Sequence, residues 1–137
     1  RFGNYLRFQS EQIVLLVRAS YLLNSGRLHD PLALSEDSET LVSVRQRSAD
    51  FAGELLGFRD IEHVLRYVHE RWDGMGYPEG LSMQEIPVES RVLGLMDVFV
   101  DELYFVEDAF AALEAVKAED GAFDPQLVAA LEEMLRG

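Results

Sequence analysis

The segment His69–Leu81 reads His-Glu-Arg-Trp-Asp-Gly-Met-Gly-Tyr-Pro-Glu-Gly-Leu and is the most distinctive stretch of the chain. Its three glycines permit positive φ angles, Pro78 fixes one φ angle, and Asp73 can accept backbone N–H groups in an Asx turn. We expect Trp72 and Tyr77 to anchor this segment on the body of the protein, because large aromatic side chains bury much apolar surface. The segment therefore predicts an ordered loop.

Helical patterns flank the loop on both sides. Asp60 is a good N-cap, and the apolar residues after it recur at helical spacings as far as Val68. Pro87 suits the first turn of a long helix that we expect to reach about residue 105. Asp97 lies within the apolar sequence of that helix. The loop is thus predicted to join two helices, one ending near His69 and the other carrying Asp97.

The remaining helices follow from caps, glycine stops and apolar stripes. In the last of them, Asp124 is the cap and Pro125 the first residue. We expect these helices at residues 10–25, with Ser10 as N-cap, and at residues 38–56, 107–118 and 125–135. The sequence therefore predicts an all-α, compact single-domain bundle of about six helices over residues 10–137. Residues 1–9 are interpreted as the remnant of a preceding helix or linker.

Composition limits the class of protein. With 137 residues, 48% of them hydrophobic, the chain can bury one sizeable core. It has no cysteine, and no apolar run reaches the roughly 20 residues that cross a bilayer. The net charge of -13 disfavours nucleic acid and anionic membranes as partners. We expect a cytoplasmic protein and, because no Met begins the chain, a fragment of a longer one.

The loop and the long helix together resemble the HD-GYP family. The helix reads Arg91-Val92-x-x-x-x-Asp97-Val98-Phe99, and Phe123-Asp124-Pro125 extends the resemblance toward the C-terminus. The resemblance covers residues 11–135 and is strongest after His69. It implies a helical bundle of the HD-domain type with two or three metal ions, whose active members hydrolyse cyclic di-GMP. The loop residues that carry it are Trp72, Asp73, Gly74, Gly76, Tyr77 and Pro78.

Most metal-binding positions that the resemblance implies are substituted here. Asn24 and Ser25 stand where relatives have a His and an Asp, and Val68 replaces the first of two histidines. In the helix predicted at residues 38–56, Arg47-Ser48-Ala49 stands where the family has another His. An amide and a hydroxyl are weak, uncharged ligands, and a valine extends the apolar stripe. We therefore interpret the site as degenerate.

His69 and Asp97 are the two residual ligand positions. They could hold one metal ion, or they could form a hydrogen-bonded pair without metal. Two protein ligands rarely hold a divalent ion, so we favour the pair and expect no cofactor. The dipeptide His29-Asp30 is an unsuitable substitute, because Pro31 follows it and it falls in a loop. His63 is expected at the surface.

These residues favour a catalytically inactive HD-GYP-like domain that acts as a regulatory or protein-interaction module in bacterial cyclic di-GMP-type signalling. The basic segment that contacts substrate phosphates in the family is replaced by the acidic Val100–Glu107. We expect no catalytic residues, and protein partners such as diguanylate cyclase-type domains, other domains of the same polypeptide or a second copy. One alternative is an active phosphodiesterase that binds Fe, Mn or Zn through Glu11, His29 or Glu36. Another is a nucleotide sensor without chemistry.

Overall fold

A computed structural model describes residues 1–23 and 38–137, and within them the secondary structure is entirely helical. The predicted all-α class is therefore confirmed, and the expected count of about six helices is close. The α-helices are α1 (Phe2–Tyr5), α2 (Ser10–Leu22), α3 (Ser38–Asp50), α4 (Arg59–Arg66), α5 (Val88–Val106), α6 (Ala109–Ala118) and α7 (Pro125–Arg136). A π-helical turn, η2 (Phe51–Leu55), continues α3, and a 3₁₀ turn, η3 (Met83–Glu85), precedes α5.

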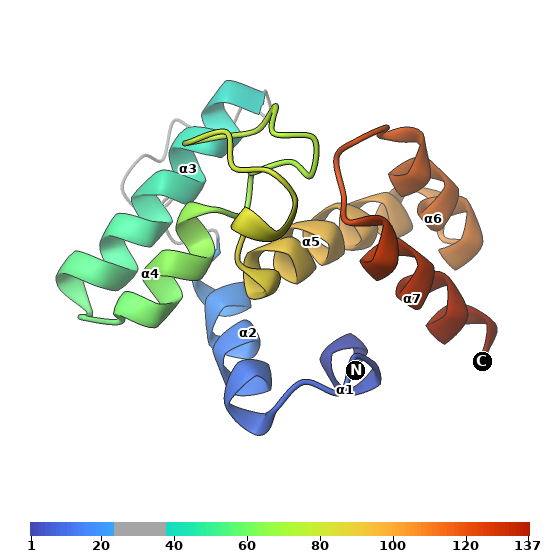
Figure 1. Ribbon diagram of the computed structural model, residues 1–137, viewed down its shortest axis with the longest axis horizontal. Helices are drawn as coiled ribbons and strands as arrows, with labels where there is room; N and C mark the ends of the chain where they lie inside the picture. The colour runs from blue at the N-terminus through green and yellow to red at the C-terminus, as the bar shows by residue number, and fades with distance from the viewer. Residues whose placement is uncertain (24–37) are drawn as a thin grey trace.

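Helix α5 is the centre of the arrangement. Helices α3 and α4 lie together on one side of it and α6 and α7 on the other, while α1 and α2 lie along a third side (Figure 1). The connection from α4 to α5 passes over the middle of the molecule (Figure 1). None of the helices in the described ranges is long and apolar enough to cross a membrane.

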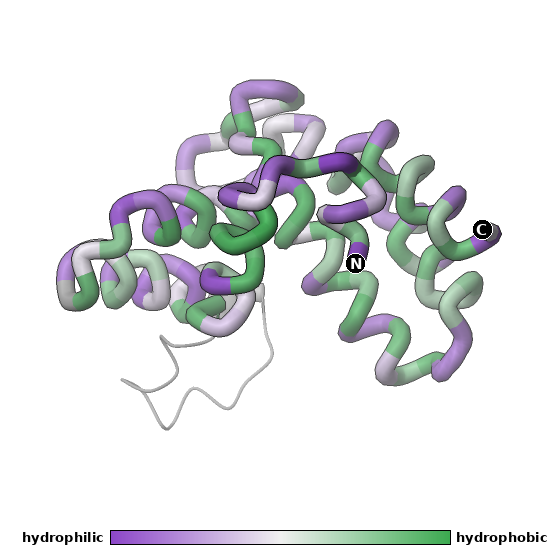
Figure 2. Tube along the Cα trace, turned by 90° about the horizontal axis from the view of Figure 1, so that it is seen from below, coloured by the Kyte–Doolittle hydropathy of each residue, from purple (hydrophilic) through white to green (hydrophobic). Residues whose placement is uncertain are grey.

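Two groups of buried side chains make up the core, and α5 contributes to both because successive residues of a helix face different directions. Val92, Leu95 and Phe99 pack with side chains of α1, α6 and α7. Leu93 packs instead with side chains of α2, α3, η2 and α4. Hydrophobic and hydrophilic residues are interspersed along the helices (Figure 2).

The predicted helix limits agree closely with the structure for α3, α5 and α7, whereas two N-caps and the end of α4 differ. Asp124 caps α7 by accepting from the backbone N–H of Gln126 at 2.9 Å, as expected. The N-cap of α2 is Gln9 rather than Ser10. The N-cap of α4 is Phe58, and the predicted cap, Asp60, lies in the first turn. At α2 and α4, local sequence marked the region of the helix start but not the residue, and helix ends are uncertain by one or two residues on any local criterion.

The N-terminal residues take part in the packing. Phe2 is buried in the core beside α5, α6 and α7, and the Tyr5 hydroxyl donates to Glu133 of α7 at 3.1 Å. The division of the chain into residues 1–9 and 10–137 stays a prediction.

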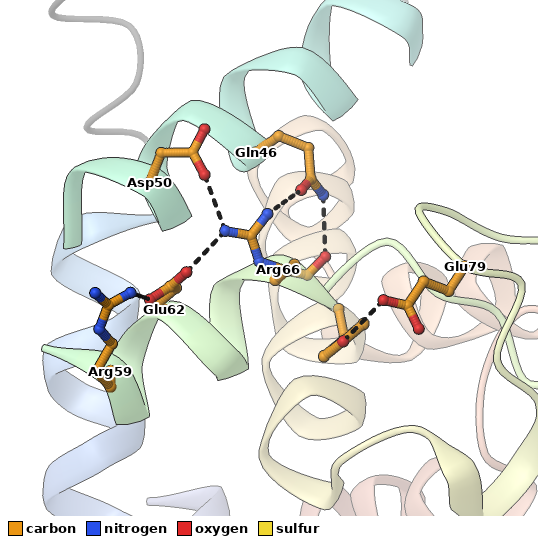
Figure 3. Close-up of polar contacts among 7 residues, drawn as sticks. Gln46, Asp50, Arg59, Glu62, Arg66 and Glu79 are labelled. Atoms are coloured by element: carbon orange, nitrogen blue, oxygen red, sulfur yellow. Dashed lines mark hydrogen bonds and ion pairs between the residues drawn. The ribbon is translucent and has the colours of Figure 1, made fainter. Parts of the chain in front are cut away.

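A polar network fixes α4 against α3. The Arg66 guanidinium donates to Asp50 of α3 and to Glu62 of α4, both at 2.9 Å (Figure 3). The Gln46 side-chain amide donates to the backbone carbonyl of Arg66 at 3.0 Å. These contacts hold the C-terminal end of α4, from which the chain enters the loop containing His69.

Candidate functional site

The position of Asp97 is set by a close approach between α5 and the end of α4. The Ser90 hydroxyl of α5 donates to the carbonyl of Val64 at 2.8 Å. At Gly94, one turn later, an added Cβ would lie 2.7 Å from the carbonyl oxygen of Val68, so only glycine allows this approach. Asp97 follows one turn beyond Gly94 and therefore comes near the segment that carries His69.

Val68 is a core residue. It is buried with Ile61, Val64 and Leu65, the three apolar residues of α4 that precede it. This agrees with the expectation that valine at this position extends the hydrophobic stripe. Helix α4 ends at Arg66, however, so Val68 and His69 follow the helix rather than complete it.

Asp97 pairs with Arg45 of α3. The Nη2 atom of Arg45 lies 2.6 Å from the Oδ2 atom of Asp97, and the two side chains are 5% and 23% exposed. The second terminal nitrogen, Nη1, donates to the carbonyl of Leu23 at the end of α2, at 2.9 Å. The Ser48 hydroxyl donates to the same carbonyl at 3.0 Å. One guanidinium thus joins α2, α3 and α5.

The expected hydrogen-bonded pair of His69 and Asp97 does not form between these two residues. The Nε2 atom of His69 is buried and has no hydrogen-bond partner within the residues that the structure describes. Asp97 takes its charged partner from a helix far away in sequence instead. An arginine is the stronger partner, because its guanidinium stays protonated at any physiological pH and donates charge-assisted hydrogen bonds.

His69 is held in its neutral form. Burial and, to a lesser extent, the positive charge of Arg45 lower the pKa of its imidazole to about 4, against a smaller opposing effect of Asp97. At pH 7 the side chain is therefore uncharged and can accept a proton or a hydrogen bond, but it adds no charge to the site.

The depressed pKa of His69 predicts a loss of stability in acid. The unfolded chain protonates this imidazole near pH 6.5, and the folded chain only near pH 4. Between these values the unfolded state binds more protons, so the free energy of unfolding rises with pH and falls as the solution is acidified. In urea unfolding, the wild type should lose roughly 2 kcal/mol more than a His69→Gln variant between pH 7 and pH 4.5. Equal losses in the two proteins would contradict the assignment.

A pocket of about 280 Å³ opens beside this group. His69, Asp97, Arg71 and Tyr77 contribute its polar groups together with Glu70 and Glu119. The apolar part of the lining comes from Val68, Gly94, Val98, Ala122 and Phe123. The predicted residual ligands therefore line a single pocket, formed by the loop, α5 and the segment between α6 and α7.

Glu70 organises the loop, a role that the sequence did not suggest. Its side chain is buried, and its Oε1 atom accepts from the backbone N–H groups of Glu79 and Gly80 at 2.7 and 3.2 Å. The Tyr67 hydroxyl donates to Glu79 at 3.1 Å. A carboxylate inside a polar loop gives no sequence signal of burial, since Glu is mostly exposed.

The loop is also tied to the segment before α7. The backbone N–H groups of Trp72 and Asp73 donate to the carbonyls of Ala122 and Gly121, both at 3.0 Å. The Asp73 side chain accepts from the N–H of Met75 at 2.9 Å, which confirms the expected Asx turn. It also accepts from the Arg71 guanidinium, which keeps the pKa of this carboxyl below its ordinary value.

The two aromatic residues of the loop behave differently. Trp72 is half-buried, and the Arg91 guanidinium lies over its ring at 5.8 Å from the centroid. Tyr77 is 60% exposed, so the prediction that it anchors the loop is wrong. The carboxylate of Glu70 and the backbone contacts of the loop supply the anchoring that we assigned to this ring.

The glycines have two separate roles. Gly74 and Gly80 have positive φ angles, as expected. Gly76 does not, and it is required because an added Cβ would overlap the backbone of Glu70 and Arg71 and lie 2.5 Å from the carbonyl oxygen of His69. The loop thus needs glycine both for turning and for close backbone contact.

The described residues do not fit a divalent metal ion. Protein sites for zinc-like ions use three or four His, Cys or carboxylate ligands, and no group of three such residues occurs in the ranges 1–23 and 38–137. The carboxylate of Asp97 already holds a fixed positive charge, that of Arg45, which would repel a cation. The predicted degenerate positions Asn24 and Ser25 lie outside the described residues. So do the substitutes His29, Asp30 and Glu36, whereas Glu11 is exposed on α2.

Comparison with known proteins places this geometry in context. The sequence profile described as HD domain matches residues 2–127. The chain is 30% identical, over 96% of its length, to the cyclic di-GMP phosphodiesterase response regulator RpfG of Xanthomonas campestris pv. campestris, of which it spans 38%. It is 32% identical, over 72% of its length, to the 3'3'-cGAMP-specific phosphodiesterase 3 of Vibrio cholerae, of which it spans 22%.

A solved structure shows the same fold. The crystal structure of a cyclic GMP-AMP-specific phosphodiesterase of V. cholerae superposes with a TM-score of 0.77 at 22% sequence identity. The match covers 99% of this chain and 41% of that protein. The helical arrangement around the pocket is therefore a fold found in a larger protein.

Proposed function

Because the chain belongs to the HD-domain family, we propose that it is a catalytically inactive member that acts as a regulatory or protein-interaction module in cyclic dinucleotide signalling. The signalling context is supported by the relatives, which are named as cyclic di-GMP and 3'3'-cGAMP phosphodiesterases. The inactivity is supported by one observation above all, the ion pair of Arg45 with Asp97.

The ion pair argues against hydrolysis on chemical grounds. Metal-dependent hydrolysis of a phosphodiester uses cations that lower the pKa of a bound water and neutralise the phosphoryl oxygens. A guanidinium cannot bind and ionise a water in this way, because it has no open coordination position. Arg45 therefore supplies positive charge to Asp97 without supplying a nucleophile. The Nε2 atom of neutral His69 has no hydrogen-bond partner in the described part of the chain, and His69 and Asp97 alone are too few ligands for a metal ion.

Metal content and turnover measured together test the proposal. We expect the purified protein to contain far less than one Fe, Mn or Zn per chain by mass spectrometry of the elements, even when expressed with added metal. Hydrolysis of cyclic di-GMP and of 3'3'-cGAMP should stay at background. A V. cholerae phosphodiesterase assayed alongside as a positive control should consume its own substrate over the same time course. Calorimetry with each dinucleotide then separates an inert module from a nucleotide sensor.

The alternative, an active phosphodiesterase with an unusual ligand set, makes the opposite prediction. Stoichiometric metal and turnover would both be present, and His69→Ala and Asp97→Ala would each abolish turnover. An exposed carboxylate outside the pocket, such as Glu54, provides the matched control, since Glu54→Ala should leave turnover unchanged. Finding turnover with this pattern would overturn the proposed inactivity.

A further inference from the structure

Exposed apolar side chains gather where α5 ends and α6 begins. Tyr104 and Phe105 are 81% and 74% exposed, and their rings meet edge to face with centroids 5.7 Å apart. Val100, Val106 and Phe110 are also exposed. We call these five residues the α5–α6 apolar surface.

These side chains are not needed by the core. Val92, Leu95 and Phe99 provide the buried face of α5, and Leu103 continues the packing in its last turns. Over the same turns Val100, Tyr104 and Phe105 are exposed beside the acidic Asp101 and Glu102, so the solvent side of α5 carries more apolar surface than an amphipathic helix usually does. Several exposed apolar residues close together in the chain, with two of their rings in contact, are more typical of an interaction site than a single one is.

The charge around the surface restricts what can bind it. Residues 92–116 contain neither lysine nor arginine, and their acidic residues include Glu102, Glu107 and Asp108. The chain as a whole carries a net charge of -13. Nucleotides, nucleic acids and anionic lipids would be repelled by this field, and a second copy would bring the same acidic residues into contact. The complementary occupant is a protein segment with apolar anchors and basic flanks.

We propose that the α5–α6 apolar surface docks a basic amphipathic helix of a partner protein. The described part of the chain has no strand, and hence no sheet edge to which an extended peptide could add. A helix packed with its apolar face on these side chains is the occupant to which the surface is suited. The aromatic pair supplies the anchors, and the acidic residues set orientation and speed of association. The inference rests on the proposed regulatory function and specifies the chemistry of the partner.

A synthetic helical peptide with leucines on one face and lysines on its flanks is a suitable probe. Titrated into the full chain by fluorescence anisotropy, it should bind the wild type and bind a Tyr104→Ser/Phe105→Ser variant about tenfold more weakly or worse. Tyr21→Ser is the matched control, because Tyr21 is an 82% exposed aromatic residue on α2. It should leave the affinity unchanged, and circular dichroism should show all variants equally folded.

A second pair of variants tests the charge. Glu102→Lys/Glu107→Lys should weaken binding and flatten its dependence on salt. Glu11→Lys/Glu54→Lys changes the net charge equally but lies on α2 and η2, and it should have a smaller effect. Equal effects of the two pairs would show attraction by net charge alone and would overturn the inference.

Three further results would also overturn it. The peptide could bind the aromatic variant as tightly as the wild type. Sedimentation could show that the wild type is a dimer and the aromatic variant a monomer, which would make a second copy the occupant. Phosphatidylserine vesicles could bind the wild type but not the variant, which would make it a lipid surface. Since the binding assay contains neither metal nor dinucleotide, a hydrolysing chain that docks the peptide would refute only the proposed function, and an inactive chain that ignores it only this inference.

Discussion

Replacing Arg45 by leucine is expected to lower the free energy of unfolding by about 3 kcal/mol or more. The guanidinium is almost fully buried, 2.6 Å from Asp97 and 2.9 Å from the carbonyl of Leu23. Leucine preserves much of the side-chain volume but leaves a partly buried carboxylate without its cation and a carbonyl without one of its donors. Urea unfolding followed by circular dichroism at pH 7 measures the loss.

A surface arginine provides the control. Arg59 pairs with Glu62 at 2.8 Å, but its side chain is 73% exposed, so Arg59→Leu should change stability by less than about 1 kcal/mol. The double variant Arg45→Leu/Asp97→Leu should recover part of the loss, because it removes the unpaired charge as well. If Arg45→Leu costs no more than Arg59→Leu, the buried ion pair does not hold the helices together.

The ion pair of Arg45 and Asp97 bears on both the stability of the fold and the proposed absence of catalysis. A metal ion that bridges helices stabilises a fold only while it is bound, and its affinity depends on pH. The guanidinium is part of the chain itself, so the contacts that join α2, α3 and α5 do not depend on a bound ion. A domain built in this way can remain folded without metal, which suits a module whose role is to present a surface.

Much of the architecture could be predicted from local sequence. Apolar spacing and glycine stops located the helices, and the segment around Trp72 and the Asp97 helix identified the family resemblance that the HD-domain match confirms. His63 was expected at the surface and is exposed there, with its ring 5.2 Å from that of Tyr67. These features depend on residues close together in the chain, where periodicity and turn chemistry carry the information.

The decisive contacts of the site could not be predicted in this way. Arg45 lies 52 residues before Asp97, and a lone arginine on a predicted helix is usually a surface residue. The motif suggested His69 as the partner of Asp97, but α3 places Arg45 closer to the Asp97 carboxylate. Tyr77 was misjudged for a related reason, because the loop is fixed through its backbone and through Glu70, which makes a large aromatic anchor unnecessary.

Substituting Gly76 by alanine is expected to lower the free energy of unfolding by about 3 kcal/mol, near the upper end for overpacking. The new methyl group would overlap backbone atoms of Glu70 and Arg71 and approach the carbonyl oxygen of His69 to 2.5 Å. Backbone atoms cannot turn aside as the tip of a long side chain can, so the loop itself has to move. The same displacement would break the hydrogen bond from the N–H of Tyr77 to the carbonyl of His69, which is 3.2 Å long.

Two measurements separate this local clash from a general effect of alanine. Gly3→Ala is the matched control, because its added methyl group would meet Ile13 at 3.5 Å, an ordinary van der Waals distance. Its free energy of unfolding should stay within about 0.5 kcal/mol of the wild-type value. In NMR spectra, the imidazole resonances of His69 should change their chemical shifts in Gly76→Ala and keep them in Gly3→Ala. An unmoved signal together with unchanged stability in Gly76→Ala would mean that the loop does not need the close backbone contact that shapes the wall of the pocket.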